Sequence, residues 1–202
     1  MGREIRRIPP TWKHPTYREW YDAGWGPYYP NVQQYGDRYT PLDDVNYDDA
    51  MNKYVDEVLL WREGKHEDQQ KYAVSEYKYL WEWDSPPSPQ YCRQGEWCFT
   101  PEQATAYQIY ETISEGTPVS PVFLTLDDMK AWLLKEGYSE ESATAFCQSG
   151  YVPSMMVYEQ GGQAEMREGI HAAGWNPTPT GVTEDEVVAA EEVFLKERKN
   201  QF

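Results

Sequence analysis

The spacing of apolar residues along the chain predicts three helices in its central part. Apolar side chains recur every three or four positions over 44–63, the period of one helix face. Thr125 and Ser139 each precede a shorter segment with the same period. Their hydroxyls can accept a hydrogen bond from a free backbone N–H of the first helical turn. We therefore expect helices over 44–63, 126–136 and 140–147.

Capping signals predict two more helices. Thr100 precedes Pro101, which suits the first helical position, and Gln103 completes a capping box. This helix is expected to end before Gly116, because glycine commonly terminates helices. Residues 184–199 open with acidic and close with basic side chains, which complements the helix dipole. A helix is expected there as well.

Three segments favour β-strands. Residues 77–83 place an aromatic ring at every second position, the period of a strand. Residues 119–124 and 155–158 are short apolar runs of the length of a strand. Few strands among several helices predict an α+β, predominantly helical single domain with a short, small sheet and a long irregular N-terminal segment.

The distribution of aromatic, glycine and proline residues suggests how the chain is divided. Eight aromatic residues lie between 17 and 39, interrupted by glycines and prolines that leave no helical period. We therefore expect an extended aromatic-rich arm wrapped on the body over 1–42, with an aromatic contact surface as the alternative. An α+β core domain follows over 43–174, then a linker over 175–182 and a C-terminal helix over 183–202.

The net charge of the chain limits the kinds of molecule that it is expected to bind. The 202 residues include 34 acids against 18 lysines and arginines, a formal net charge of −16. Such a chain repels phosphates, so direct nucleic-acid binding is not expected. No apolar run approaches the roughly 18 residues of a membrane span, so no membrane association is expected either. A strong negative field attracts basic proteins, many of which bind nucleic acids, and nucleic-acid mimicry is one hypothesis. The alternative is an acidic protein whose charge only keeps it in solution.

The first 20 residues differ from the rest of the chain, because they carry a net charge of +3. A basic segment ahead of an acidic body is typical of a tail that docks on its own surface. A partner-binding arm is the alternative.

The sequence contains no motif that identifies an enzyme. It lacks a glycine-rich phosphate loop and a Gly-x-Ser-x-Gly elbow. The three cysteines and three histidines do not have the spacing of a zinc site. Cys147 and His171 could act as nucleophile and base, but a cysteine beside Phe146 on an apolar helix face is more typical of a core. We expect no metal, no cofactor, and binding rather than catalysis, although an enzyme stays open.

Several phrases in the first 160 residues are distinctive. They are Arg3-Glu4-Ile5-Arg6-Arg7-Ile8-Pro9-Pro10, Trp81-Glu82-Trp83 with Pro86-Pro87 and Tyr91, Tyr107-Gln108-Ile109-Tyr110-Glu111-Thr112, and Ser114-Glu115-Gly116-Thr117-Pro118-Val119-Ser120-Pro121. Together they resemble an uncharacterised family of bacteriophage and prophage proteins. The resemblance implies a phage accessory protein acting in the host cytoplasm. It implies no activity, so it assigns no catalytic residue.

These observations lead to one expected function and two alternatives. We expect an acidic phage accessory protein that binds a host or defence protein with a basic surface. The alternatives are a small-ligand or nucleotide-binding protein or enzyme with its site between residues 81 and 115, and a minor virion-associated protein. The candidate binding residues lie where the phrases cluster: Trp81, Trp83, Tyr91, Tyr107, Tyr110, Glu111, Ser114 and Glu115.

Overall fold

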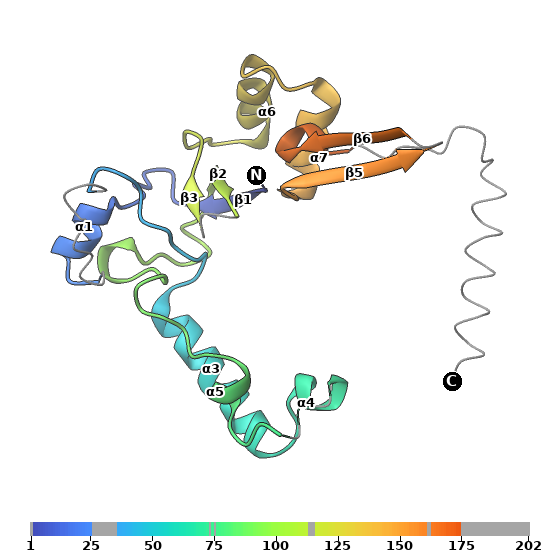
Figure 1. Ribbon diagram of the computed structural model, residues 1–202. Helices are drawn as coiled ribbons and strands as arrows, with labels where there is room; N and C mark the ends of the chain where they lie inside the picture. The colour runs from blue at the N-terminus through green and yellow to red at the C-terminus, as the bar shows by residue number, and fades with distance from the viewer. Residues whose placement is uncertain are drawn as a thin grey trace.

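The computed structural model describes residues 2–25, 36–72, 74, 76–112, 116–160 and 163–174. A four-stranded antiparallel sheet lies near the middle of the molecule, with its strands in the order β3-β2-β1-β4 (Figure 1). The strands are β1 (Arg3–Ile8), β2 (Ala106–Glu111), β3 (Thr117–Pro118) and β4 (Tyr151–Val152). The two long strands, β1 and β2, therefore occupy the centre of the sheet.

Strand β1 comes from the basic N-terminal stretch. Ile5 pairs with Ile109 and packs on the main core, whereas Ile8 is buried in a smaller one. The arginines Arg3 and Arg6 of β1 are paired with nearby carboxylates. Arg3 lies 3.0 Å from Glu111, its cross-strand neighbour, and Arg6 lies 2.6 Å from Glu4. Opposite charges on facing strands stabilise a sheet, so this basic stretch can be a central strand.

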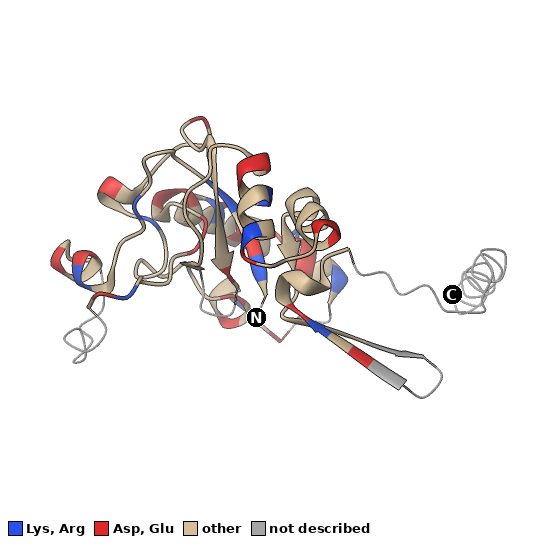
Figure 2. Cartoon of the chain, turned by 90° about the horizontal axis from the view of Figure 1, so that it is seen from above, with Lys and Arg blue, Asp and Glu red and all other residues tan. Residues whose placement is uncertain are grey.

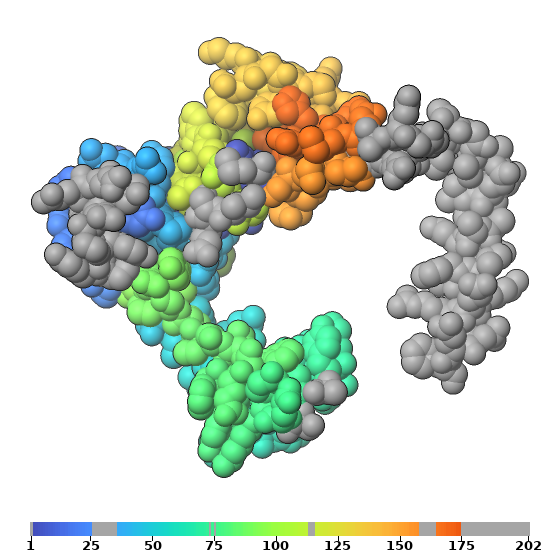
Figure 3. Space-filling model, in the orientation of Figure 1, coloured from blue at the N-terminus to red at the C-terminus, as the bar shows by residue number. Residues whose placement is uncertain are grey.

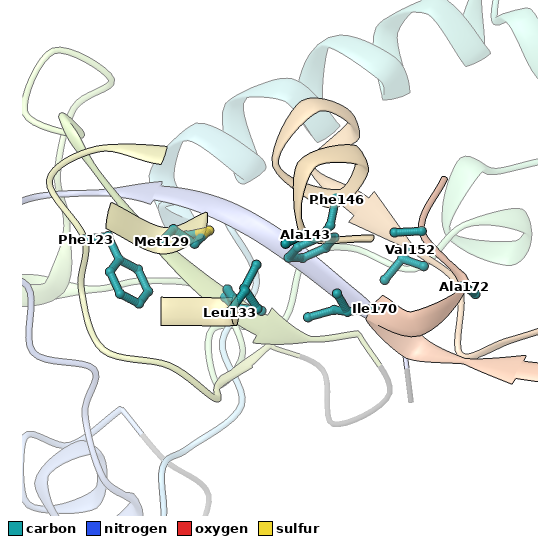
Figure 4. Close-up of a cluster of buried hydrophobic side chains, with 10 residues drawn as sticks. Phe123, Met129, Leu133, Ala143, Phe146, Val152, Ile170 and Ala172 are labelled. Atoms are coloured by element: carbon teal, nitrogen blue, oxygen red, sulfur yellow. The ribbon is translucent and has the colours of Figure 1, made fainter. Parts of the chain in front are cut away.

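Helices α6 (Leu126–Lys135) and α7 (Glu140–Ser149) pack with the sheet around the main hydrophobic core. Met129 and Leu133 come from α6, Phe146 comes from α7 and Ile109 from β2, and all four are at most 1% exposed. Figure 4 shows side chains of this cluster from the two helices gathered beside the strands.

A second sheet is a separate hairpin of β5 (Met155–Gln160) and β6 (Gln163–Glu168). It extends away from α7, and the short 3₁₀ helix η2 (Gly169–Ala172) follows it (Figure 1). Met156 of β5 and Ile170 of η2 join the main core. The base of the hairpin is therefore anchored to the main core. We call the four-stranded sheet, the helices α6 and α7 and the segments packed on them the body.

The remaining helices lie on the other side of the sheet. Helix α1 (Tyr17–Asp22) and the 3₁₀ helix η1 (Gly95–Trp97) lie near the body, and Trp20 packs on Trp97. Helices α3 (Tyr47–Arg62), α4 (Glu67–Lys71) and α5 (Leu80–Trp83) form a projection that we call the helical lobe, residues 47–72, 74 and 76–84. Figures 1 and 3 show the lobe standing away from the sheet.

The expectation of a predominantly helical domain with a long irregular N-terminal segment was wrong. The described residues form six α-helices and six β-strands, so the fold is a mixed α+β one. Part of the expected irregular segment is the central strand β1. The prediction failed there because the pattern of β1 is dominated by arginines, whose partners on β2 lie about 100 residues away.

Two segments adopt the opposite structure to the one predicted. One of the two contacts of the capping box at Thr100 is present, since the Thr100 backbone N–H donates to the Gln103 side chain at 2.8 Å, but the Gln103 N–H donates to the Thr100 carbonyl, only a turn follows, and 106–111 is strand β2. Pairing with β1 and β3 overrides the local signal. Conversely, 80–83 is the one-turn helix α5, because Glu82 accepts a hydrogen bond from the Tyr79 backbone N–H at 2.9 Å.

Most of the other helices and strands predicted on described residues were close. Helices α3, α6 and α7 and strand β5 are confirmed within a few residues. Thr125 and Ser139 cap α6 and α7 as expected. The strand predicted over 119–124 was wrong, because the chain forms no strand there and makes only a single bridge to β2, Tyr107 with Phe123. The predicted helix over 184–199 lies outside the described residues.

Candidate functional site

The end of the helical lobe presents a surface of exposed aromatic rings. We call it the aromatic surface and define it as Tyr72, Tyr79, Trp81 and Trp83. Trp81 is 62% exposed, and the other three side chains are between 39% and 47% exposed. Contiguous exposed apolar groups on a protein surface mark sites of interaction, so this surface is the strongest candidate site.

A small core beneath the rings holds them in place. Trp61 of α3, Val74 and Leu80 of α5 are buried there, with Tyr54 and Val58 packed against them. Leu80 is buried in this core, whereas its chain neighbours Tyr79 and Trp81 are 46% and 62% exposed and lie at the surface. The capping contact from Glu82 fixes the helix start.

The rings make ordered contacts with one another. Tyr79 and Trp81 are stacked, with centroids 6.0 Å apart and planes 13° apart. Trp83 lies 5.4 Å from Tyr77 and 6.1 Å from Tyr72, and its indole N–H donates to Asp68 at 3.0 Å. Rings that are already packed lose little side-chain entropy when a partner binds.

Acidic residues outnumber basic ones in the lobe that carries the aromatic surface. Residues 47–84 include ten acids and five lysines or arginines. Two of those cations, Lys71 and Lys78, lie 5.1 Å and 5.0 Å from the Tyr72 and Tyr79 ring centroids. The rings therefore already attract ammonium groups of this chain. The lobe as a whole is suited to a cationic partner, because aromatic faces and carboxylates both attract positive charge.

A polar cluster attaches the lobe to the body. The Arg93 guanidinium donates to Asp44 at 2.5 Å and to the Asn46 side-chain oxygen at 3.1 Å, and it lies 3.9 Å above the Phe99 ring. Asn46 donates in turn to the Phe99 carbonyl at 3.0 Å. Asn46 stands at the N-cap position of α3, and its side chain makes no capping hydrogen bond there. The cluster fixes the start of α3.

The candidate residues predicted from sequence do not form one site. Trp81 and Trp83 are in the aromatic surface of the lobe, whereas Tyr107, Tyr110 and Glu111 are on strand β2 in the central sheet (Figure 1). Tyr91 lies in the loop before η1, where its carbonyl accepts a hydrogen bond from the backbone of Asp43. Ser114 and Glu115 lie outside the described residues.

The β2 candidates have structural partners. Tyr110 is buried, and its hydroxyl donates to Gln108 at 2.9 Å and accepts from the Trp12 indole at 3.0 Å. Burial raises the pKa of Tyr110 well above its usual value. Glu111 is paired with Arg3, and the Arg7 guanidinium lies 6.0 Å from the Tyr107 ring centroid. These residues hold the sheet together.

His14 completes this buried network. Its Nε2–H donates to the Thr40 carbonyl at 2.6 Å, which leaves Nδ1 facing the Tyr110 hydroxyl at 3.4 Å. Burial lowers the pKa of His14 to about 4, partly offset by the hydrogen bond to Thr40. The imidazole is therefore neutral at physiological pH. Because the network is enclosed, His14 does not present an accessible base.

Sequence reasoning missed Tyr72 and Tyr79 of the aromatic surface. The signal that could have found Tyr79 was the alternation Tyr77, Tyr79, Trp81, Trp83, which we interpreted as a strand. Nothing in the pattern indicates that Leu80, between the rings, is the residue that points inward.

No metal or membrane site emerges from the described part of the chain. There, no three His, Cys, Asp or Glu side chains are grouped so that they could hold a metal ion. Within the same residues, no helix combines the length and apolar character needed to cross a bilayer.

Comparison with known proteins does not supply a function. No protein-family model, no curated protein and no solved structure matches this chain. Its function must therefore be inferred from its own residues, among which the aromatic surface on the acidic lobe is the feature best suited to binding.

Proposed function

We propose that this protein is a bacteriophage accessory protein that binds a basic protein of the host cell through the aromatic surface of its helical lobe. The observation that carries the proposal is the exposure of Trp81, Trp83, Tyr72 and Tyr79 together on a projecting acidic lobe. The resemblance of several phrases to phage proteins supports its origin and a site of action in the host cytoplasm.

Charge and rings have separate roles in this proposal. A net charge of −16 speeds the approach of a basic partner. Burial of indole and phenol rings then supplies most of the affinity, since such side chains dominate binding hot spots. Trp81 has the largest exposed fraction of the surface and is the expected anchor.

Direct protein binding is favoured over nucleic-acid mimicry. A mimic needs acids arrayed like the phosphates of one strand. Figure 2 shows acidic residues spread over several helices and loops, with lysines and arginines between them. The negative electrostatic field of the protein therefore attracts a basic partner, although its acids do not reproduce the phosphate spacing of a nucleic-acid strand.

The proposal is tested by capturing host proteins at low salt with wild-type protein, Trp81→Ala and Tyr151→Ala. Tyr151 is a matched control, because it is 55% exposed but lies on β4 rather than in the lobe. We expect a basic protein to be retained by wild type and Tyr151→Ala. The affinity of Trp81→Ala for that protein, measured by titration, should be at least about tenfold lower, as is typical of a hot spot. Equal capture by all three proteins, or capture of only acidic proteins, contradicts the proposal.

A further inference from the structure

A second candidate surface lies on the body, away from the aromatic surface of the lobe. It is a groove of about 370 Å³ between the segment that follows β1, with α1, and the segment around η1. Three aromatic side chains line it, Trp12, Trp97 and Phe99. Sequence reasoning did not select these residues, because they come from segments some 85 residues apart.

The aromatic walls are held rigidly. Trp12 packs edge-to-face on Phe99, with ring centroids 5.0 Å apart and planes at 77°. Its indole N–H donates a hydrogen bond to the Tyr110 hydroxyl at 3.0 Å. Trp97 packs on Trp20 at 5.2 Å, and Trp20 is in turn buried and donates to the Gln90 carbonyl at 3.2 Å. A groove whose rings are already fixed binds a ligand with a small entropic cost.

Trp97 also leaves a hydrogen-bond donor for a ligand. Its side chain is half-buried, and its indole N–H meets no acceptor among the residues that the structure describes. An indole N–H beside the aromatic rings of the groove favours a ligand that offers carbonyl oxygens.

Two carboxylates give the groove its charge preference. Glu19 and Glu96 line it, against the single cation Lys13. The Thr16 backbone N–H donates to Glu19 and lowers the pKa of that carboxyl, so it is ionised at neutral pH. A ligand with arginine or lysine side chains is therefore complementary to the groove.

These features fit one kind of ligand. A polyproline II segment has no internal hydrogen bonds, so its carbonyls are free to accept, and its proline rings pack between aromatic side chains. Because the segment is preformed, it loses little entropy on binding. We propose that the groove of Trp12, Trp97 and Phe99 binds a basic, proline-rich peptide in the polyproline II conformation. This inference does not rest on the function proposed for the lobe.

Cys98 provides a direct readout of groove occupancy. It lines the groove and is exposed, whereas Cys92 is buried and Cys147 half-buried. The experiment measures the rate of Cys98 alkylation in the full-length protein with increasing amounts of a ten-residue peptide that has prolines at alternate positions and an arginine at each end. Two control peptides replace all prolines by alanine or both arginines by glutamate.

We expect saturating proline-arginine peptide to slow alkylation of Cys98 at least about fivefold, while both control peptides bind at least tenfold more weakly. Trp97→Ala should weaken binding at least tenfold, and Trp97→Phe, which keeps a ring but removes the N–H donor, should weaken it less. Glu96→Lys should weaken binding of the arginine peptide and improve binding of the glutamate peptide. Glu136→Lys, at the end of α6, is the control and should change neither.

Three results would overturn the proposal. One is unchanged Cys98 alkylation at millimolar peptide. Another is equal protection by the alanine peptide, which would indicate charge attraction without recognition of proline. The third is undiminished binding to Trp97→Ala that retains the wild-type circular dichroism spectrum.

Discussion

Individual residues of the buried network around Tyr110 explain why part of the sequence prediction did not lead to a site. Tyr110 and Glu111 belong to a distinctive phrase, and both were candidate binding residues. In the structure the Tyr110 hydroxyl is hydrogen-bonded to Trp12 and Gln108, and the Glu111 carboxylate forms an ion pair with Arg3. Polar side chains that satisfy one another inside a fold specify its packing.

His14 is expected to make the protein less stable in mild acid. The pKa of a histidine in an unfolded chain is about 6.5, whereas that of His14 in the fold is lowered to about 4. Between these values the unfolded chain binds a proton that the folded chain does not. The free energy of unfolding should therefore be highest above pH 6.5, fall as the pH decreases, and have lost roughly 3 kcal/mol near pH 4 from this residue.

Urea unfolding at several pH values between 7.5 and 5 tests this expectation. His14→Gln is the comparison, because a glutamine amide can still donate to the Thr40 carbonyl but does not titrate. His66 and His171 are present in both proteins, so the difference between the two slopes isolates His14. Identical pH dependence in wild type and His14→Gln would show that His14 is not the source.

Among the elements, those predicted well differ physically from those predicted badly. Helices α6 and α7 have local causes, namely the Thr125 and Ser139 caps and a helical apolar period, and both can be read from neighbouring residues. Strand β2 is a strand because β1 and β3 lie beside it. No pattern within 106–111 contains that information, so the Thr100 capping box was misleading. The groove between Trp12 and Trp97 was unpredictable for the same reason.

Gly116, directly before β3, lies very close to two other segments of the chain. Its φ is +97°, and a Cβ there would overlap the Leu42 carbonyl oxygen and the Arg6 guanidinium. Gly116→Ala should therefore destabilise the protein by several kcal/mol, through strain and a backbone clash. Gly137 is a matched control, because its φ is +96° and no atom lies within 4 Å of its added Cβ. Gly137→Ala should cost only about 1 kcal/mol.

Chemical denaturation of the two glycine variants beside wild type measures the difference. Similar losses for Gly116→Ala and Gly137→Ala would mean that the backbone at Leu42 moves aside at little cost. The segment over 36–42 would then be attached to the sheet more loosely than the contacts indicate.

At the scale of the whole molecule, the body and the helical lobe have cores of different size. The main core contains ten buried residues, including side chains from α6, α7 and the central sheet. The lobe core contains three, Trp61, Val74 and Leu80. A smaller buried area gives less protection against local opening.

Hydrogen exchange should therefore divide the chain into two groups. Backbone amides of α3 beyond Tyr54 and of α5 are expected to exchange at least about tenfold faster than paired amides of β1 and β2, because the lobe can open without unfolding the sheet. Mass spectrometry of peptides from each region checks this. Uniform protection in all four elements would show that the lobe and the body unfold together.

The central position of β1 also affects how the protein is made. During synthesis, Ile5 leaves the ribosome 104 residues ahead of its partner Ile109. At roughly 5–20 residues per second, translation leaves the first strand unpaired for about 5–20 s. During that interval the arginines of β1 keep the unpaired strand hydrated, because charged side chains discourage an exposed strand from pairing with other chains. The same residues that later find carboxylate partners thus protect the nascent polypeptide from aggregation.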